Sequence, residues 1–353
     1  MNVNRREFIG GAGAAVAATA RGGAKPAKEK IWCMYQQLGW HFWKISNPLA
    51  ENGHFCGEET PIRDDFWQQH IAKCREIGCN MMCVDVGEGL AYPSHPELAL
   101  KGSRSPEWMH ARIRELNAAG VEVIPSLNFS MGHDAWLGWY HRMVSTPTYY
   151  KVCRDLIRDV WEVFNHPRFI NFGMDEESPD IGDNPRTPMA AFRQGELLWH
   201  DIDFYTREIE KVGARPWMWS DLEWWYPEDY VKHVSREVVQ SNWYYGVEFD
   251  LAKAKRPVKQ YLTAFLDLDK AGYDQIPGGS NWMSKQLRKV MKKNDVNVPR
   301  LLKFCREHIS DSHLMGFYCT AWGDHGDSGN REWLDAADIF GKAIKDWKSH
   351  EQA

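Results

Sequence analysis

Three consecutive carboxylates, Asp175, Glu176 and Glu177, follow a short apolar segment at residues 168–174. This segment has the length and apolar content of a buried strand, and Asn171 is its only interior polar residue. A polar loop containing prolines comes next, and it can continue neither a strand nor a helix. Neighbouring acids at the end of a buried strand repel one another, which raises the pKa of at least one of them and suits general acid catalysis.

The same acids have a simpler explanation as a solvated turn, or as residues that favour the N-terminus of a following helix. The next helical pattern begins only near Phe192 or Glu196, which is too far along the chain for the second explanation. We therefore take Asp175 and Glu176 as the candidate catalytic residues.

Other apolar segments also end in acids, namely Asp221, Asp324 and, less clearly, Asp85 or Glu88. Aromatic residues surround these acids in a chain that holds 18 Trp. Carboxylates framed by indole rings suit glycoside cleavage: an acid protonates the departing oxygen, and the rings stack on the apolar face of a sugar. A single Trp is more often core packing than a ligand contact, so the grouping at segment ends carries this prediction. The candidate substrate-binding residues are Trp219, Asp221, Trp243, Tyr244, Tyr245, Trp282, Trp322, Asp324 and His133.

An alternation of strand and helix patterns positions these residues. The expected strands are 31–37, 80–86, 121–127, 168–174, 215–220, 238–243, 274–278 and 315–321, and the expected helices are 64–77, 106–119, 147–165, 196–212, 258–270, 299–311 and 332–347. Eight such units predict an α/β fold, a (β/α)8 TIM barrel that forms a single domain over residues 31–350. In that fold the loops after the strands gather on one face, and the candidate residues fall in those loops.

The N-terminus resembles an export signal. Arg5 and Arg6 form a twin-arginine pattern, a weakly apolar Gly/Ala run covers 10–17, and small residues suited to cleavage follow at 18–20. We expect residues 1–20 to be a signal for the twin-arginine translocation machinery and 21–30 to be a linker, so that the protein is periplasmic or secreted. The signal is too short and glycine-rich for a stable membrane span, and no later segment reaches spanning length.

Composition narrows the remaining possibilities. The net charge is -5 and no basic stripe is present, which argues against nucleic acid as a partner. The eight cysteines show no zinc-binding spacing, and most lie in apolar patterns, so we expect mostly free, buried thiols. The favoured interpretation needs a carbohydrate substrate and neither a cofactor nor a metal.

The segment Gly173-Met174-Asp175-Glu176 resembles the Gly-x-Asp-Glu signature of family 20 glycoside hydrolases, the β-N-acetylhexosaminidases. The resemblance extends to Trp219-Ser220-Asp221 and to Thr320-Ala321-Trp322-Gly323-Asp324, and so covers most of the predicted barrel in order. Asn171 and Met174 stand where the family has a histidine and a second glycine, and the family's strand-one arginine has no counterpart.

This resemblance implies an exo-acting, retaining hydrolase in which the 2-acetamido oxygen of the sugar attacks the anomeric carbon. Glu176 would then be the general acid/base, and Asp175 would hold the acetamido N–H and stabilise the oxazolinium. The implied contacts are Tyr244 or Tyr245 to the acetamido oxygen, Trp219, Trp243 and Trp322 as pocket walls, and Asp324 to the ring hydroxyls.

Two other classes of function stay open from the residues alone. One is a metal-dependent sugar isomerase or epimerase on the same barrel, with ligands such as Glu176, Asp221, His133 and His325. The other is a non-catalytic, exported carbohydrate-binding protein, which needs the aromatic walls but not the clustered acids.

Overall fold

The computed structural model describes residues 29–39, 60, 63–177, 193–323 and 326–351. The predicted export signal at 1–20 and most of the predicted linker at 21–30 lie outside the described residues, as do Asp324 and His325.

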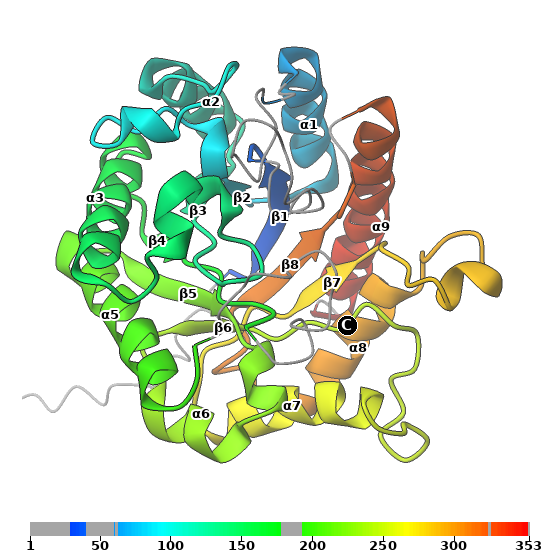
Figure 1. Cartoon of the computed structure of the whole chain (residues 1–353). Helices are drawn as coiled ribbons and strands as arrows, with labels where there is room; N and C mark the ends of the chain where they lie inside the picture. The colour runs from blue at the N-terminus through cyan, green and yellow to red at the C-terminus, as the bar shows by residue number, and fades with distance from the viewer. Residues whose placement is uncertain (1–28, 40–59, 61–62, 178–192, 324–325, 352–353) are drawn as a thin grey trace, which may run out of the picture.

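Eight parallel strands form one sheet in the order β6-β5-β4-β3-β2-β1-β8-β7. They are β1 Ile31–Gln37, β2 Met81–Asp85, β3 Glu122–Ser126, β4 Phe169–Asn171, β5 Arg215–Trp219, β6 Val239–Ser241, β7 Gly278–Ser280 and β8 Gly316–Thr320. The two ends of this order meet, because Gln240 bridges to Gln275 and Trp243 bridges to Gly278. Across this seam the Ile276 amide donates to the Gln240 carbonyl at 2.8 Å, and the Gly278 amide donates to the Asn242 carbonyl at 2.8 Å. The sheet therefore closes into a barrel (Figure 1).

Helices surround this barrel on the outside (Figure 1). The α-helices are α1 Asp64–Ile77, α2 Pro106–Ala118, α3 Pro147–Val163, α5 Glu196–Val212, α6 Pro227–His233, α7 Val258–Lys270, α8 Asn297–His308 and α9 Asp327–Glu351. Short 3-10 helices are η2 Gly87–Gly89, η3 Pro96–Leu98, η4 Ala135–Arg142, η5 Asp221–Trp224 and η6 Leu287–Lys289. Local sequence sets several of the helix starts: Pro147 takes the first position of α3, and the Thr146 side chain accepts the Tyr149 amide as the N-cap.

The predicted (β/α)8 barrel is confirmed, and most elements lie within a few residues of their expected bounds. The strand expected at 274–278 is shifted, since β7 is Gly278–Ser280. Gln275 still makes isolated bridges to both neighbouring segments. Pro277 lacks an amide hydrogen and interrupts the ladder between the two parts. The sequence patterns missed α6, which at seven residues is too short to show a helical period.

A cluster of alternate strand residues fills the barrel interior, and a larger one packs the sheet against the helices. The interior cluster contains Cys33, Tyr35, Met81, Cys83, Trp217, Trp219 and Tyr318. Trp219 stacks on Tyr318 with ring centroids 5.0 Å apart and an angle of 9° between the planes. The aromatic core of the barrel therefore continues up to the ends of the strands.

The seven cysteines within the described ranges are all buried and free, as expected from the sequence. They are Cys33, Cys74, Cys79, Cys83, Cys153, Cys305 and Cys319. None of the helices in the described part of the chain combines the length and the apolar content needed to cross a bilayer.

Candidate active site

A tight backbone turn follows β4 and presents the acidic pair. Gly173, Met174 and Glu176 have φ values of 75°, 69° and 57°, in the left-handed region that side chains with a Cβ rarely adopt. A Cβ at Gly173 would lie 2.2 Å from the Asn128 side-chain oxygen, so only glycine fits there. The strand predicted to reach residue 174 ends at Asn171 for this reason.

His133, in the loop after β3, joins the two candidate catalytic acids. Its Nε2 atom lies 3.3 Å from Asp175 Oδ2 and 3.0 Å from Glu176 Oε2. Asn128 Nδ2 donates to the other oxygen of Asp175 at 2.7 Å. The side chain of Asp175 is 16% exposed and that of Glu176 is 39% exposed. Asp175 is thus held from two sides, while Glu176 keeps more access to a bound ligand.

The charges of this group are interdependent. Burial alone would raise the pKa of Asp175, but the charge of His133 and hydrogen bonds from His133 and Asn128 outweigh it and lower that pKa. Burial likewise opposes the imidazolium form of His133, yet Asp175 and Glu176 raise the pKa of His133 well above its ordinary value. The two shifts therefore both favour an ionised Asp175 beside a protonated His133.

Asp221 lies two positions after β5 and supports the acidic pair through hydrogen bonds. Its Oδ2 atom accepts the backbone N–H of Glu176 at 2.8 Å, and its Oδ1 atom accepts the Trp243 indole N–H at 3.2 Å. Burial, followed by repulsion from Asp175, raises the pKa of Asp221 to about 7. The rise was expected for one of the three consecutive acids that begin at Asp175, but the pKa of Asp175 is lowered, and the raised pKa belongs to Asp221, outside that run, with burial as its first cause.

Asp85, at the end of β2, is a second buried acid near this group. It accepts the Tyr35 hydroxyl at 2.6 Å. Burial raises the pKa of Asp85 to about 7; the Tyr35 hydrogen bond opposes that rise, and the charge of Asp175 adds to it.

A cavity of about 130 Å³ opens above these acids. It is lined by His133, Asp175, Glu176, Trp219, Trp243, Tyr245, Trp282 and Trp322. These residues lie at the ends of six different strands, β3 to β8, or in the loops after them, so the barrel brings together side chains that are far apart in the sequence. The Trp243 and Tyr245 rings stack at 4.9 Å, and the Tyr245 and Trp322 centroids are 6.4 Å apart. The cavity therefore combines an acidic floor with aromatic walls.

The structure does not bring every predicted residue to this cavity. Tyr244 belongs to the hydrophobic core and packs against Phe249, with ring centroids 5.2 Å apart, so Tyr245 is the tyrosine at the site. Asp221 acts on the acidic pair through its hydrogen bonds rather than as a lining residue. Asp324 lies outside the described residues.

Asn128 was not among the predicted residues, although its place two positions after β3 is a signal that could have identified it. The ligands considered for a metal-dependent isomerase are only partly assembled: His133 and Glu176 are neighbours, and His325 is outside the described residues. Within the described ranges, no three His, Cys, Asp or Glu side chains are grouped so that they could hold a metal ion.

A buried ionic cluster behind the pair was also not predicted. Arg193 lies 3.3 Å from Glu177 and 2.8 Å from Asp201, and the three side chains are at most 1% exposed. Glu177 also accepts the backbone amides of Met131 at 2.6 Å and Arg193 at 3.0 Å. These bonds fix the residue next to Glu176 and the loop that carries His133. We infer that the cluster positions the acidic pair.

Replacing Arg193 by Met should lower the free energy of unfolding by about 3–5 kcal/mol, because it leaves the Glu177 and Asp201 carboxylates buried without their partner. Urea denaturation measures this loss. The matched control is Arg207→Met, which breaks an exposed ion pair with Asp203 on the same helix as Asp201 and should change stability little. Equal losses in the two variants would show that the buried cluster contributes no more to the free energy of unfolding than an exposed ion pair does.

Known proteins resemble this chain in structure but not detectably in sequence. No protein-family model matches it, and no curated protein matches it. Among solved structures it is similar to the GH20 β-N-acetylhexosaminidase from Streptomyces coelicolor A3(2), with a TM-score of 0.57, 12% identity, and coverage of 88% of this chain and 64% of that one.

Two further structures give the same picture. The β-N-acetylhexosaminidase from Bacteroides fragilis NCTC 9343 has a TM-score of 0.57 and 14% identity, covering 92% of this chain and 71% of that one. A mutant Streptomyces plicatus β-hexosaminidase in complex with the product GlcNAc has a TM-score of 0.59 and 11% identity, covering 92% and 66%. The matched region spans less than two thirds of the Streptomyces coelicolor enzyme. At these identities the likeness establishes the barrel fold.

Proposed function

We propose that this protein is a retaining glycoside hydrolase that removes β-linked 2-acetamido sugars. The observation that carries the proposal is the pair Asp175 and Glu176, which lines an aromatic cavity and is bridged by His133. The solved structures of similar fold support it, since their names describe hexosaminidases and one contains GlcNAc as product. The substrate is accordingly a carbohydrate.

In the first step, Glu176 protonates the glycosidic oxygen while the acetamido oxygen of the substrate attacks the anomeric carbon. The bond to the leaving oxygen breaks, its electron pair stays on that oxygen with the proton from Glu176, and an oxazolinium forms. In the second step, the Glu176 carboxylate takes a proton from water as that water attacks the anomeric carbon. The oxazolinium ring opens, and the sugar is released with its configuration retained.

Asp175 suits the other half of this chemistry because its lowered pKa keeps it ionised. A carboxylate there would accept the acetamido N–H and stabilise the positive charge that develops on the oxazolinium. Tyr245 is the candidate donor to the acetamido oxygen, since it lines the cavity and Tyr244 does not. The indole walls would stack on the sugar and exclude water from the reacting bond.

A panel of aryl β-glycosides with and without a 2-acetamido group tests the proposal. We expect hydrolysis of the acetamido glycosides only, with the β-anomer as the first product seen by NMR. Equal hydrolysis of glycosides that lack the acetamido group would contradict substrate assistance. A lack of hydrolysis of every member of the panel would contradict the assignment as a β-glycosidase.

Replacing His133 by Asn should move the acidic limb of the kcat/KM profile to higher pH. The acidic limb reports the ionisation of Asp175, because the reaction needs its carboxylate form. Activity therefore falls as the pH drops through the pKa of Asp175. Burial raises that pKa, whereas His133 lowers it by its charge and its hydrogen bond. Removing the imidazolium should therefore raise the pKa of Asp175.

A pH–rate series on one acetamido glycoside measures the shift. The control is His166→Asn, which changes an exposed histidine that pairs with the exposed Glu162 and stacks on Trp161. An acidic limb that stays in place in the His133 variant would show that His133 does not control the ionisation of Asp175.

We also propose that the protein is exported by the twin-arginine machinery. The Arg5-Arg6 pair, the Gly/Ala run and the small residues at 18–20 support this proposal. Replacing both arginines by lysine should leave the protein in the cytoplasm, which cell fractionation measures. Unchanged export would contradict the proposal.

A further inference from the structure

The segment between β7 and α8 projects away from the barrel (Figure 1). Its residues 285–293 carry five cations and no acid, in a chain whose net charge is -5. The cations are Lys285, Arg288, Lys289, Lys292 and Lys293. The chain was expected to hold no basic stripe, and this short run, which we call the basic tip, is an exception to that expectation.

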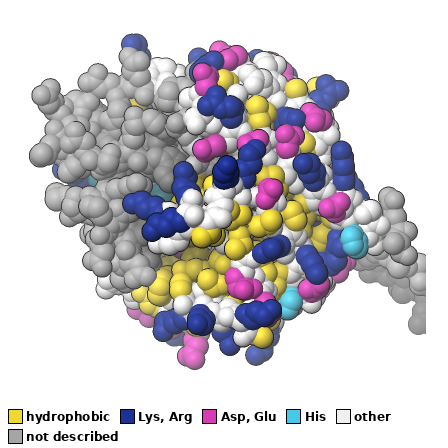
Figure 2. Space-filling view, turned by 90° about the vertical axis from the view of Figure 1, so that its right-hand side faces the viewer, with side chains coloured by type: hydrophobic (Ala, Val, Ile, Leu, Met, Phe, Trp, Pro, Cys, Tyr) yellow, Lys and Arg dark blue, Asp and Glu magenta, His cyan; other side chains and the backbone are white. Residues whose placement is uncertain are grey.

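The basic tip also presents an apolar side chain to solvent. No residue from 285 to 293 is buried. Val290 is 80% exposed, the highest value among the large hydrophobic side chains in the described part of the chain. Figure 2 faces this side of the molecule and shows Lys and Arg side chains beside hydrophobic ones on the surface. Along the chain, Val290 is flanked by cations on both sides.

Local hydrogen bonds order the backbone of the basic tip. The Ser284 hydroxyl oxygen accepts the Leu287 amide at 3.2 Å. The amides of Val290 and Met291 both donate to the Leu287 carbonyl at 3.0 Å. The backbone N–H groups next to the exposed apolar side chain are therefore already paired, so that moving Val290 out of water leaves no amide without a partner.

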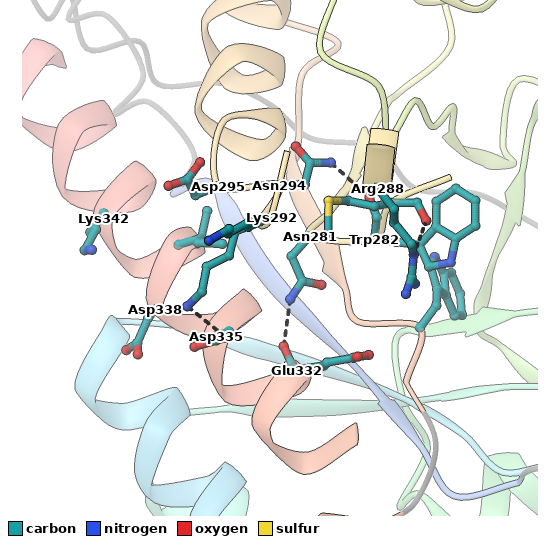
Figure 3. A pocket seen from close by; sticks show the side chains of 14 residues that line it. Asn281, Trp282, Arg288, Lys292, Asn294, Asp295, Glu332, Asp335, Asp338 and Lys342 are labelled. Atoms are coloured by element: carbon teal, nitrogen blue, oxygen red, sulfur yellow. Dashed lines mark hydrogen bonds and ion pairs between the residues drawn. The ribbon is translucent and has the colours of Figure 1, made fainter. Parts of the chain in front are cut away.

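The base of the segment is attached to the barrel. The buried Asn294 side chain donates to the backbone carbonyls of Tyr245 and Trp282, at 2.9 Å each. On its inner side the segment lines a cavity of about 360 Å³ against α9 (Figure 3). There Lys293 pairs with Asp335 of α9 at 3.4 Å. The other four cations of the tip pair with no carboxylate of the described residues, so most of the positive charge is available to a partner.

Cations beside an exposed apolar side chain suit the surface of a bilayer that contains anionic lipids. The lipid phosphates attract the ammonium and guanidinium groups. Val290 and the methylene stems of the lysines can then enter the boundary between the headgroups and the acyl chains. A soluble polyanion would use the same charges but would gain nothing from the exposed Val290. The apolar residue at the tip therefore favours a lipid surface over a dissolved polymer.

We propose that the basic tip docks the protein on anionic phospholipid bilayers, through its cations and through insertion of Val290. This docking surface goes beyond the proposed glycosidase function, since none of the residues 285–293 lines the catalytic cavity. The contact is reversible and weakens as the salt concentration rises, because exposed charges are screened.

The test is co-sedimentation of the purified protein with vesicles of phosphatidylcholine alone, or of phosphatidylcholine and phosphatidylglycerol in equal parts. We expect binding to the mixed vesicles only, and its loss at high ionic strength. A Lys285→Ala/Lys289→Ala/Lys292→Ala variant should bind about a hundredfold more weakly, because each cation near the surface contributes roughly a factor of five. Val290→Ala should weaken binding about tenfold, because less apolar surface enters the bilayer.

The matched control is Lys259→Ala/Lys345→Ala/Lys348→Ala, which removes the same charge from exposed positions on α7 and α9. It should bind the mixed vesicles as the wild type does, and thermal unfolding checks that all variants are folded. Equal weakening in the control would show an effect of net charge alone and would overturn the docking site, as would a wild type that does not bind the mixed vesicles.

Dextran sulfate, a soluble polyanion, tests the alternative partner. Binding to it as tight as to the vesicles, together with no effect of Val290→Ala, would assign the basic tip to a dissolved polymer and overturn lipid docking. These measurements need no turnover, so their outcome is distinct from that of the aryl glycoside panel.

Discussion

Replacing Glu176 by Gln should lower kcat/KM by about 10²–10⁴-fold on acetamido glycosides with poor leaving groups, while the fold is retained. The substitution preserves the shape of the side chain and removes the transferable proton, together with the carboxylate charge that lies 3.0 Å from His133. The backbone amide of Glu176 keeps its hydrogen bond to Asp221, so the turn that presents the residue remains supported. Steady-state kinetics and thermal unfolding of both proteins measure the two parts of this result.

A series of leaving groups makes the role of Glu176 specific. Proton donation matters less as the leaving group becomes more acidic, so the loss in the Glu176→Gln variant should shrink along the series. The control is Glu210→Gln, an exposed glutamate of α5, which should leave the kinetics unchanged. A variant that cleaves poor leaving groups at the wild-type rate would exclude Glu176 as the general acid.

The second large effect is expected for Asp175→Asn, which should reduce kcat/KM on acetamido glycosides by about 10²–10³-fold. The substitution removes the negative charge that would face the oxazolinium. It also removes one of the two carboxylates that hold His133, at 3.3 Å. Kinetics on the acetamido glycosides, with thermal unfolding as the check on folding, measure the effect.

Asp175 also contributes to stability, and the sign of this contribution follows from its pKa. The folded protein lowers that pKa, so the contribution is present above the unfolded pKa of about 3.9 and is lost as the pH falls through the folded value. The Asn variant should lack this pH dependence. If the Asp175→Asn variant retained activity on acetamido glycosides, substrate assistance would be excluded, and the enzyme would use either a direct nucleophile or an inverting pair of acids. The anomer of the first product would distinguish these two mechanisms.

The barrel could be predicted because its signal is distributed over the chain. Apolar strand patterns recur eight times and helical periods seven times, and helix α1, Asp64–Ile77, has the expected bounds. The acidic pair could be predicted because parallel strands of a barrel all end on one face. Composition and order along the chain were sufficient for both conclusions.

What the sequence could not predict depends on side-chain direction and on long-range contacts. Tyr244 and Tyr245 are neighbours of the same type, and only the packing of the chain against Phe249 decides which one faces the cavity. Arg193 and Glu177 are 16 residues apart across a polar loop, where charged residues are usually solvated. Their buried ion pair behind the acidic pair depends on how the chain folds, so no local sequence pattern indicates it.

The buried thiols of the barrel give a means of observing its opening. Burial raises the pKa of Cys33 on β1, Cys83 on β2 and Cys319 on β8, and each is fully enclosed. Cys33 and Cys83 belong to the barrel interior, whereas the Cys319 thiol contacts the Ala336 carbonyl of α9. A thiol reagent can therefore react at Cys33 and Cys83 only when the barrel opens, and at Cys319 only when α9 leaves the sheet or the barrel opens. Labelling rates of the thiols on these three adjacent strands therefore measure how often the barrel wall opens, separately from ligand binding or catalysis in the cavity.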